Sequence, residues 1–181
     1  MTPPISFPLR TERLELRPFV DDDLDALLAM QSDEAVTRYL NWGPQSRRQV
    51  KELLERIKLM TVRLAVVLPD SGAVVGDVSL WRTSGEHAQG EIGFVVHPDH
   101  QRRGYATEAC GALLRLGFEQ LGLHRIVGRA DARNVASIGV MERIGMRREA
   151  HHRENEWIKG EWTDEVICAA LAHEWLAPSS A

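Results

Sequence analysis

One short stretch restricts the fold more than any other part of the chain, because in it an apolar strand turns into a helix through an arginine-rich loop. Glu91–Val96 (EIGFVV) reads as a buried strand, and the apolar spacing of Ala106–Leu121 predicts a helix. Between them, His97-Pro98 cannot easily continue either element. The loop Gln101–Ala106 (QRRGYA) then places two arginines and a glycine at the start of the helix. The stretch predicts a strand, a binding loop and a helix in immediate succession.

Apolar patterns elsewhere predict further strands and helices in one mixed arrangement. A capping box at Ser46 and Gln49 predicts the start of a helix that carries Val50, Leu53, Leu54 and Ile57 on one face. The other predicted helices follow Val20 and Asn134, and the predicted strands are 12–19, 124–130, 147–158, 162–171 and a hairpin within 63–81 that turns at 69–72. The pattern predicts one α/β domain with a mixed, largely antiparallel sheet.

Length and composition favour a single globular domain over residues 1–181, with flexible ends at 1–10 and 177–181. The hydrophobic fraction of 44% is enough for a core, and the net charge of −4 argues against nucleic acid as the main partner. No apolar run is long enough to span a bilayer, so we expect a soluble, cytoplasmic protein without a membrane partner. Cys110 and Cys168 are expected to be reduced core residues. The His97/His100 and His151/His152 pairs have no third ligand in sequence, so no metal is expected.

The arginine-glycine loop has the properties of an anion site. Backbone N–H groups at a helix N-terminus have no intrahelical acceptor and carry the positive end of the helix dipole. Gly104 allows a phosphate to approach the backbone closely, and Arg102 and Arg103 add positive charge. Neither a P-loop nor a dinucleotide-binding glycine pattern is present. The residues therefore indicate a small ligand that bears a diphosphate, with a solvated arginine-rich turn as the alternative.

Four segments, in order along the chain, resemble one known superfamily. Gln101-x-x-Gly104-x-Ala106 resembles the coenzyme A pyrophosphate loop of the GCN5-related N-acetyltransferases (GNAT), and Asn134-x-x-Ser137 with 141–146 resembles their second cofactor segment. The opening 11–27 and the closing 160–171 resemble the RimJ/RimL branch of ribosomal-protein N-terminal acetyltransferases. The resemblance covers the chain from Thr11 to Leu171.

The resemblance implies a fold and a set of cofactor contacts. The fold is a twisted, mostly antiparallel mixed sheet of about seven strands, with a splayed central pair and flanking helices. The implied cosubstrate is acetyl-CoA. For two of the implied residues another role is possible: Asn134 could simply cap its helix, and Arg143 could be a surface arginine. The implied cofactor residues are Phe94, Val95 and Val96 for the pantetheine arm, the amides of Arg102, Arg103, Gly104, Tyr105, Ala106 and Thr107 for the pyrophosphate, Asn134 and Ser137 for the thiol region, and Arg143 for the adenosine phosphates.

The same resemblance implies the catalytic residues. A backbone N–H of the splayed strand, at Val96, is placed to donate to the oxyanion. Many family members carry a tyrosine that acts as general acid where this chain has Met141, whose thioether cannot donate a proton. The RimJ/RimL-type arrangement instead implies Ser137 as the hydrogen-bond donor to the leaving thiolate and Glu156 as the base, with Glu91 as an alternative base.

The acceptor that the resemblance implies is a primary amine. A protein or peptide α-amine, with a pKa of about 8, is expected first because more of it is neutral than of a lysine amine at about 10.4. A small amine such as a polyamine, an amino acid or an antibiotic is the alternative, and a non-catalytic acyl-CoA sensor is a further one. Four tryptophans, 42, 81, 157 and 162, are candidates for the acceptor pocket or the core. The protein is expected to be a monomer or a homodimer.

Overall fold

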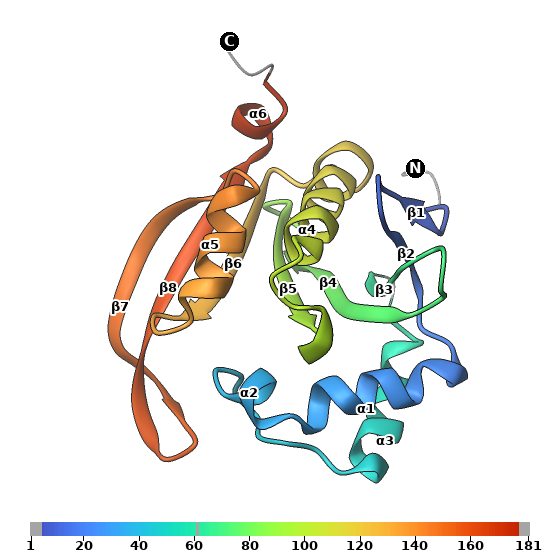
Figure 1. Cartoon of the computed structure of the whole chain (residues 1–181). Helices are drawn as coiled ribbons and strands as arrows, with labels where there is room; N and C mark the ends of the chain where they lie inside the picture. The colour runs from blue at the N-terminus through green and yellow to red at the C-terminus, as the bar shows by residue number, and fades with distance from the viewer. Residues whose placement is uncertain (1–4, 61, 178–181) are drawn as a thin grey trace.

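An eight-stranded sheet forms the centre of the protein in the computed structural model, which describes residues 5–60 and 62–177 (Figure 1). The strands lie in the order β1-β2-β3-β4-β5-β6-β8-β7. Within the described sheet, β5 and β6 run parallel and the other neighbouring strands run antiparallel. The strands are β1 (Leu9–Arg10), β2 (Glu15–Pro18), β3 (Arg63–Val67), β4 (Val74–Ser84), β5 (Gln89–Val96), β6 (Arg125–Asp131), β7 (Arg147–Ile158) and β8 (Glu161–Leu171).

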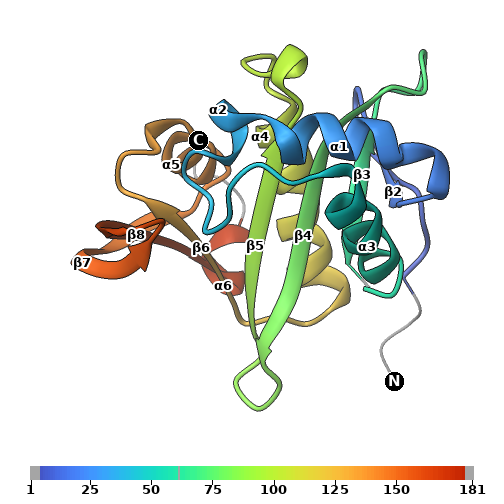
Figure 2. The same ribbon diagram turned by 90° about the horizontal axis from the view of Figure 1, so that it is seen from below.

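Helices cover both faces of this sheet, and each face has its own core (Figure 2). On one face, α4 (Tyr105–Arg115) and α5 (Val135–Arg143) bury apolar side chains such as Leu113 and Met141 against the strands. On the other face, α1 (Leu24–Ser32) and α3 (Arg47–Ile57) bury Leu27 and Leu54. The remaining helical segments are short: Asp21–Asp23, α2 (Glu34–Thr37), Pro98–His100, a π-helical turn at Leu116–Gln120, and α6 (Ala172–Trp175).

Local sequence signals set several of these element boundaries. The predicted capping box at the start of α3 is confirmed, since Ser46 N–H donates to Gln49 Oε1 at 2.9 Å and Gln49 N–H donates to Ser46 Oγ at 3.5 Å. The predicted hairpin is also confirmed. A hydrogen bond from Gly72 N–H to Leu68 O, at 2.8 Å, closes its turn. Gly72 has a φ of 69°, in the left-handed region that glycine favours.

The N-terminal part of the chain contributes more structure than the sequence predicted. The sheet has eight strands and not about seven, because Leu9–Arg10 pairs with Leu16 and Glu15 as the edge strand β1. Ile5 and Phe7 also lie against the core, whereas flexibility was expected for the whole of 1–10. A two-residue strand is too short for its alternation to be recognised in sequence. Residues 1–4 and 178–181, which belong to the expected flexible ends, lie outside the described residues.

Met141 of α5 is a core residue and packs against β6. Its side chain is 1% exposed, and its sulfur lies beside Gly128 of β6. A Cβ atom added at Gly128 would meet this sulfur well inside van der Waals contact. Gly128 therefore gives α5 the space to lie directly on the strand.

We expect Gly128→Ala to destabilise the protein by about 1–3 kcal/mol, because the added methyl group overpacks this contact. Urea unfolding of the variant measures the change. Gly111→Ala is the matched control, since a Cβ there meets nothing within 4 Å and alanine favours the α4 helix. The control should be at least as stable as the wild type. Equal stability of Gly128→Ala and the wild type would contradict the packing argument.

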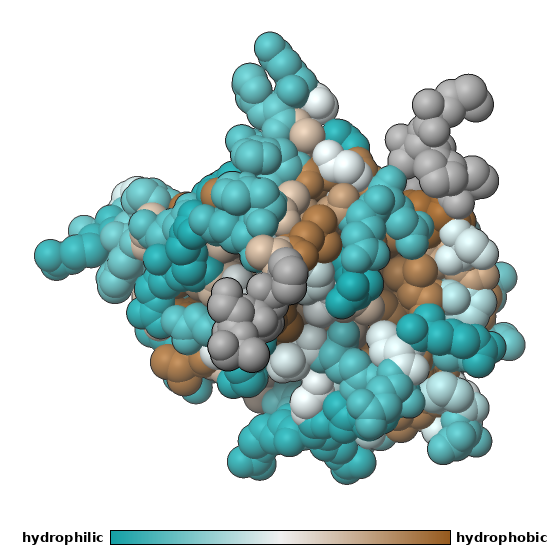
Figure 3. Space-filling model, turned by 90° about the horizontal axis from the view of Figure 1, so that it is seen from above, coloured by the Kyte–Doolittle hydropathy of each residue, from teal (hydrophilic) through white to brown (hydrophobic). Residues whose placement is uncertain are grey.

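Cys110 and Cys168 are both buried and free of disulfides, as the sequence predicted. In the described part of the chain, none of the helices has the length and apolar character that crossing a membrane requires. The end of the molecule that carries β1 and α6 shows mainly hydrophilic side chains, with hydrophobic surface between them (Figure 3).

Candidate active site

A gap between the parallel strands β5 and β6 is the main feature of the site. Their pairing ends at Ile92 and Gly128. Beyond that point β5 stays paired with β4 as far as Val96, and β6 stays paired with β8 as far as Asp131. Each strand follows its other neighbour, so the two separate into a V. This is the splayed central pair that the family resemblance implied.

The end of β5 directs backbone donors into this gap. His97 N–H donates to Val75 O of β4 at 2.9 Å. Because successive N–H groups of a strand point to opposite sides, those of Val96 and Phe94 point away from β4 and towards the gap. The carbonyl of Val96, on the same side, accepts a hydrogen bond from Gln101 Nε2 at 3.4 Å. This bond ties the strand end to the loop that follows.

That loop forms an open cradle of N–H groups at the start of α4. Gly104 is the N-cap residue and has a φ of 82°, in the left-handed region that glycine favours. Arg102 also has a positive φ, 59°, which is uncommon for a non-glycine residue. The first backbone bond of the helix runs from Glu108 N–H to Gly104 O. The N–H groups of Tyr105, Ala106 and Thr107 are therefore left for a ligand.

Arg143 lies beside this cradle, although it comes from α5. Its Nε donates to Thr107 Oγ1 in the first turn of α4 at 3.4 Å. The side chain also lies over Gly139, where a Cβ would come within 3.1 Å of Arg143 Nη1. Arg103 turns back to its own loop, where its Nη2 donates to Asp99 O at 3.1 Å. The positive charge at the cradle thus comes from α5 and from the loop before α4.

Asn134 and Ser137 meet at the N-terminus of α5, immediately after β6. Asn134 Oδ1 accepts a hydrogen bond from Ser137 N–H at 3.1 Å, so Asn134 is the N-cap of the helix. The helix-cap alternative for Asn134 is therefore present in the structure. Its contact with a pantetheine arm stays a prediction, as does the role of the half-buried Ser137.

Carboxylates gather on the sheet face that carries α1 and α3, around the gap. Arg129 of β6 joins two of them, donating to Glu91 Oε2 at 3.3 Å and to Glu165 Oε2 at 3.2 Å. Asn155 Nδ2 also donates to Glu165 Oε2, at 3.0 Å. Paired residues of neighbouring strands share a face, so Asp131, which pairs with Glu165, belongs to the same group.

Glu91 is the carboxylate of this group that lies next to the point where the strands separate. Burial raises the pKa of Glu91 from its ordinary value, and the nearby Glu165 and Glu156 raise it further, while Arg129 opposes the shift. Its side chain is 18% exposed. Glu91 pairs with Val127, one residue before the strands separate. A half-buried carboxylate next to the gap is a candidate general base.

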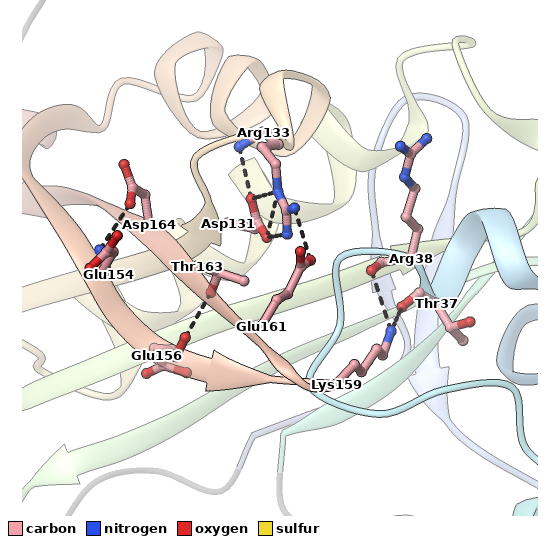
Figure 4. Close-up of polar contacts among 10 residues, drawn as sticks. All are labelled: Thr37, Arg38, Asp131, Arg133, Glu154, Glu156, Lys159, Glu161, Thr163 and Asp164. Carbon is pink, nitrogen blue, oxygen red and sulfur yellow. Dashed lines mark hydrogen bonds and ion pairs between the residues drawn. The ribbon is translucent and has the colours of Figure 1, made fainter.

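Glu156 lies on β7, near the tip of the β7–β8 hairpin, opposite Thr163 (Figure 4). It is exposed, and its backbone carbonyl accepts a hydrogen bond from Thr163 Oγ1 at 3.3 Å. The hairpin tip is tied to α2, since Lys159 Nζ donates to Thr37 O at 2.6 Å and to Arg38 O at 3.3 Å. Glu156 therefore stands on a hairpin whose tip is fixed to the C-terminal end of α2.

Arg133 and Glu161 extend the charged face beside this hairpin. Arg133 Nη2 bonds Asp131 Oδ2 at 2.6 Å, and its Nη1 bonds Glu161 Oε1 at 2.9 Å (Figure 4). The face thus carries the carboxylates of Glu91, Asp131, Glu156, Glu161 and Glu165 and the guanidinium groups of Arg129 and Arg133. Negative charge is in excess, which favours a cationic ligand on this side.

Sequence reasoning missed Arg129 and Glu165. Their signal in β6 is alternation, because every second residue of GRAD (128–131) is charged although the strand is central, and in β8 it is the polar run TDE (163–165). The core alternative is wrong for three of the tryptophans, since Trp81, Trp157 and Trp162 are 40%, 61% and 57% exposed, while Trp42 is half-buried. Within residues 5–60 and 62–177, no group of three or more His, Cys, Asp or Glu side chains is arranged to hold a metal ion.

Two surface hollows lie away from the gap. One, of about 430 Å³, lies beside the C-terminal half of β4, and its lining includes Leu59 and Trp81. The other, of about 440 Å³, lies behind α4, between Leu9 and Trp175. Neither includes the separated strand ends or the cradle. The open V of the backbone and its unpaired donors therefore locate the site.

Comparison with known proteins identifies the family. Residues 13–147 match the acetyltransferase (GNAT) domain. The chain belongs to the GNAT acetyltransferases. This GNAT enzyme is 34% identical over 168 residues to the uncharacterized N-acetyltransferase YnaD of Bacillus subtilis (strain 168), a match that covers 92% of this chain and 98% of that protein. It is thus an acetyl-CoA-dependent N-acetyltransferase that acts on amines.

A solved structure and a more distant relative extend this comparison. The crystal structure of a GNAT-family acetyltransferase from Bacillus anthracis matches with a TM-score of 0.86 and 33% identity, over 91% of this chain and 98% of that chain. Spermidine N(1)-acetyltransferase of Escherichia coli (strain K12) is 25% identical over 168 residues, which cover 91% of this chain and 89% of that enzyme. The GNAT fold expected from sequence is confirmed.

Proposed function

We propose that this GNAT enzyme transfers the acetyl group of acetyl-CoA directly to a primary amine that carries further positive charge, such as a polyamine. The acid-rich face beside the gap carries this proposal, because its five carboxylates outnumber its two guanidinium groups around Glu91. A carboxylate-rich surface attracts a polycation more strongly than a single ammonium group. The likeness to a spermidine acetyltransferase supports the same acceptor class.

A protein or peptide α-amine is the second candidate acceptor, and it would place the chain in the RimJ/RimL-like branch. Its support is chemical, since an α-amine with a pKa of about 8 needs less help to lose its proton than a side-chain amine at about 10.4. The opening segment at 11–27 and the closing segment at 160–171 add the resemblance to that branch.

The proposed donor site uses the gap and the cradle. Acetyl-CoA supplies the acetyl thioester. The N–H groups from Arg102 to Thr107 hold its pyrophosphate, and Arg143 approaches the adenosine phosphates. The strand Phe94–Val96 pairs with the pantetheine arm through the backbone groups that β6 leaves free, close to Asn134. The positive φ at Gly104 and the unpaired N–H groups of the first helical turn fit a diphosphate.

The proposed reaction requires three groups around the acetyl carbon. The amine nitrogen forms a bond to the carbonyl carbon, and the carbon–sulfur bond then breaks. Val96 N–H donates to the carbonyl oxygen as negative charge develops on it. Glu91 or Glu156 accepts the proton that the nitrogen loses. Ser137 donates a hydrogen bond to the departing thiolate, which needs little more because its conjugate thiol has a pKa of about 8.5.

Thiol release from acetyl-CoA across a panel of acceptors tests this proposal. Spermidine, spermine, a peptide with a free N-terminus and the same peptide with a blocked N-terminus and one lysine separate the acceptor classes. We expect the polyamines to give the highest kcat/KM at low ionic strength, with a loss as salt screens the acidic face. The highest kcat/KM for the free N-terminus would favour the second candidate, and no release with any amine would contradict the proposal.

Removal of the loop charges should weaken CoA binding without abolishing it. In the double variant Arg102→Ala/Arg103→Ala, the N–H cradle remains, so a loss of about 1–3 kcal/mol is expected. Calorimetry at low and high salt should show a smaller salt dependence than in the wild type, because exposed charges are screened by salt. Wild-type affinity of the double variant at low salt would instead assign both arginines to a solvated turn.

A further inference from the structure

Arg13, between β1 and β2, contacts the cradle although it lies about 90 residues before it in the chain. Its Nη1 donates to Arg103 O at 3.0 Å. Its Nε donates to Glu108 Oε2 at 2.7 Å, and its backbone N–H donates to Glu108 Oε1 at 2.8 Å. The guanidinium also lies 5.1 Å from the ring centroid of Tyr105. One side chain thus contacts three of the residues around the start of α4.

Glu108 makes this contact rigid. Thr11 Oγ1 donates to Glu108 Oε1 at 2.6 Å, in addition to the bonds from Arg13. Burial alone would raise the pKa of Glu108, but the hydrogen bonds from Thr11 and Arg13 outweigh it and lower the pKa. Glu108 is therefore ionised at neutral pH. It fixes the Arg13 guanidinium from one side while the other side reaches the loop.

The bond to Arg103 O sets the orientation of one peptide group. In a planar trans peptide, the C=O and the following N–H point in opposite directions. Because Arg13 holds the Arg103 carbonyl, the N–H of Gly104 points to the opposite side. A reversed peptide would place a carbonyl oxygen at the cradle, where it would repel a phosphate.

Arg13 also lies against the back of Gly104. A Cβ atom added there would come within 3.2 Å of Arg13 Nη2. The guanidinium thus occupies the side of the turn towards which a side chain would project. The opposite side, with the N–H groups of the first turn, is left for the ligand.

We propose that Arg13 is a positioning residue for the diphosphate of CoA: it locks the Arg103–Gly104 peptide so that its N–H faces the ligand. The inference rests on the proposed donor site. An exposed ion pair between Arg13 and Glu108 would by itself add little to stability. The bond to a loop carbonyl, together with the hydrogen bonds from Thr11 and Arg13 to Glu108, gives the pair this second role.

Steady-state kinetics of Arg13→Gln with two donors test the proposal. The KM for acetyl-CoA should rise on the order of tenfold, as expected for the loss of a charged hydrogen bond that orders the loop. S-acetylpantetheine has the thioester but no diphosphate, so its kcat/KM should stay at the wild-type value. The KM for the amine should also be unchanged. Glu108→Gln should raise the KM for acetyl-CoA as Arg13→Gln does. Arg13→Lys should not restore the wild-type KM, because an ammonium group cannot bridge Glu108 and the Arg103 carbonyl as a guanidinium does.

Arg10→Gln is the matched control, since Arg10 lies in the same segment but pairs with Glu15. It should leave the KM for acetyl-CoA unchanged. Equal losses of Arg13→Gln with both donors, or an unchanged KM for acetyl-CoA, would overturn the role of Arg13. If the wild type used S-acetylpantetheine as well as acetyl-CoA, the diphosphate site itself would fail, which is a different result from a failure of Arg13.

Discussion

Gly104→Val is expected to abolish CoA binding while the fold is retained. Gly104 holds a φ of 82°, which a β-branched residue adopts only under strain. Its Cβ would also press on Arg13 Nη2, 3.2 Å away, and so displace the group that holds the loop. Both effects disturb the N–H cradle. Calorimetry with CoA should detect no binding at concentrations well above the wild-type dissociation constant.

Gly72→Val separates backbone strain from loss of the site. Gly72 has a comparable φ of 69°, but it lies in the β3–β4 turn, away from the cradle. This control should lose thermal stability to a similar degree and keep its affinity for CoA. A folded Gly104→Val variant that binds CoA as tightly as the wild type would exclude the pyrophosphate assignment.

The central unit of the fold could be predicted from sequence because its signals are local. The strand before His97, the glycine at the start of α4 and the capping box at Ser46 each act within a few residues. The same holds for the β3–β4 hairpin, whose turn residues are adjacent in sequence. Residues 13–147, which match the GNAT domain, contain all of these units.

The contacts that complete the site could not be predicted, because they join distant residues. Arg13 reaches Glu108, and Arg129 joins Glu91 to Glu165 across three strands. A bulge between His152 and Glu156 also changes the register of β7, so alternation alone cannot assign the face of Glu156. Charge pairs and bulges of this kind depend on strand order, which local patterns leave open.

Glu91→Gln is expected to lower kcat on the order of a hundredfold at pH 6–7, more than Glu156→Gln. Glu91 is half-buried and stands next to the gap, and burial raises its pKa, whereas Glu156 is exposed. A base with a raised pKa accepts a proton more readily, and its activity is lost only as the pH falls through that pKa. Towards pH 9 solvent supplies more neutral amine, so the loss should be partly rescued.

The two carboxylates are distinguished by comparing both variants at each pH with the same acceptor. Glu161→Gln is the matched control, because Glu161 lies on the same face but pairs with Arg133. It should keep the wild-type pH profile. Ser137→Ala should lower the rate only about ten- to a hundredfold with little added pH dependence, as expected for one hydrogen bond to a thiolate. A larger, pH-rescued loss in Glu156→Gln than in Glu91→Gln would make Glu156 the base and leave Glu91 to bind the charge of the acceptor.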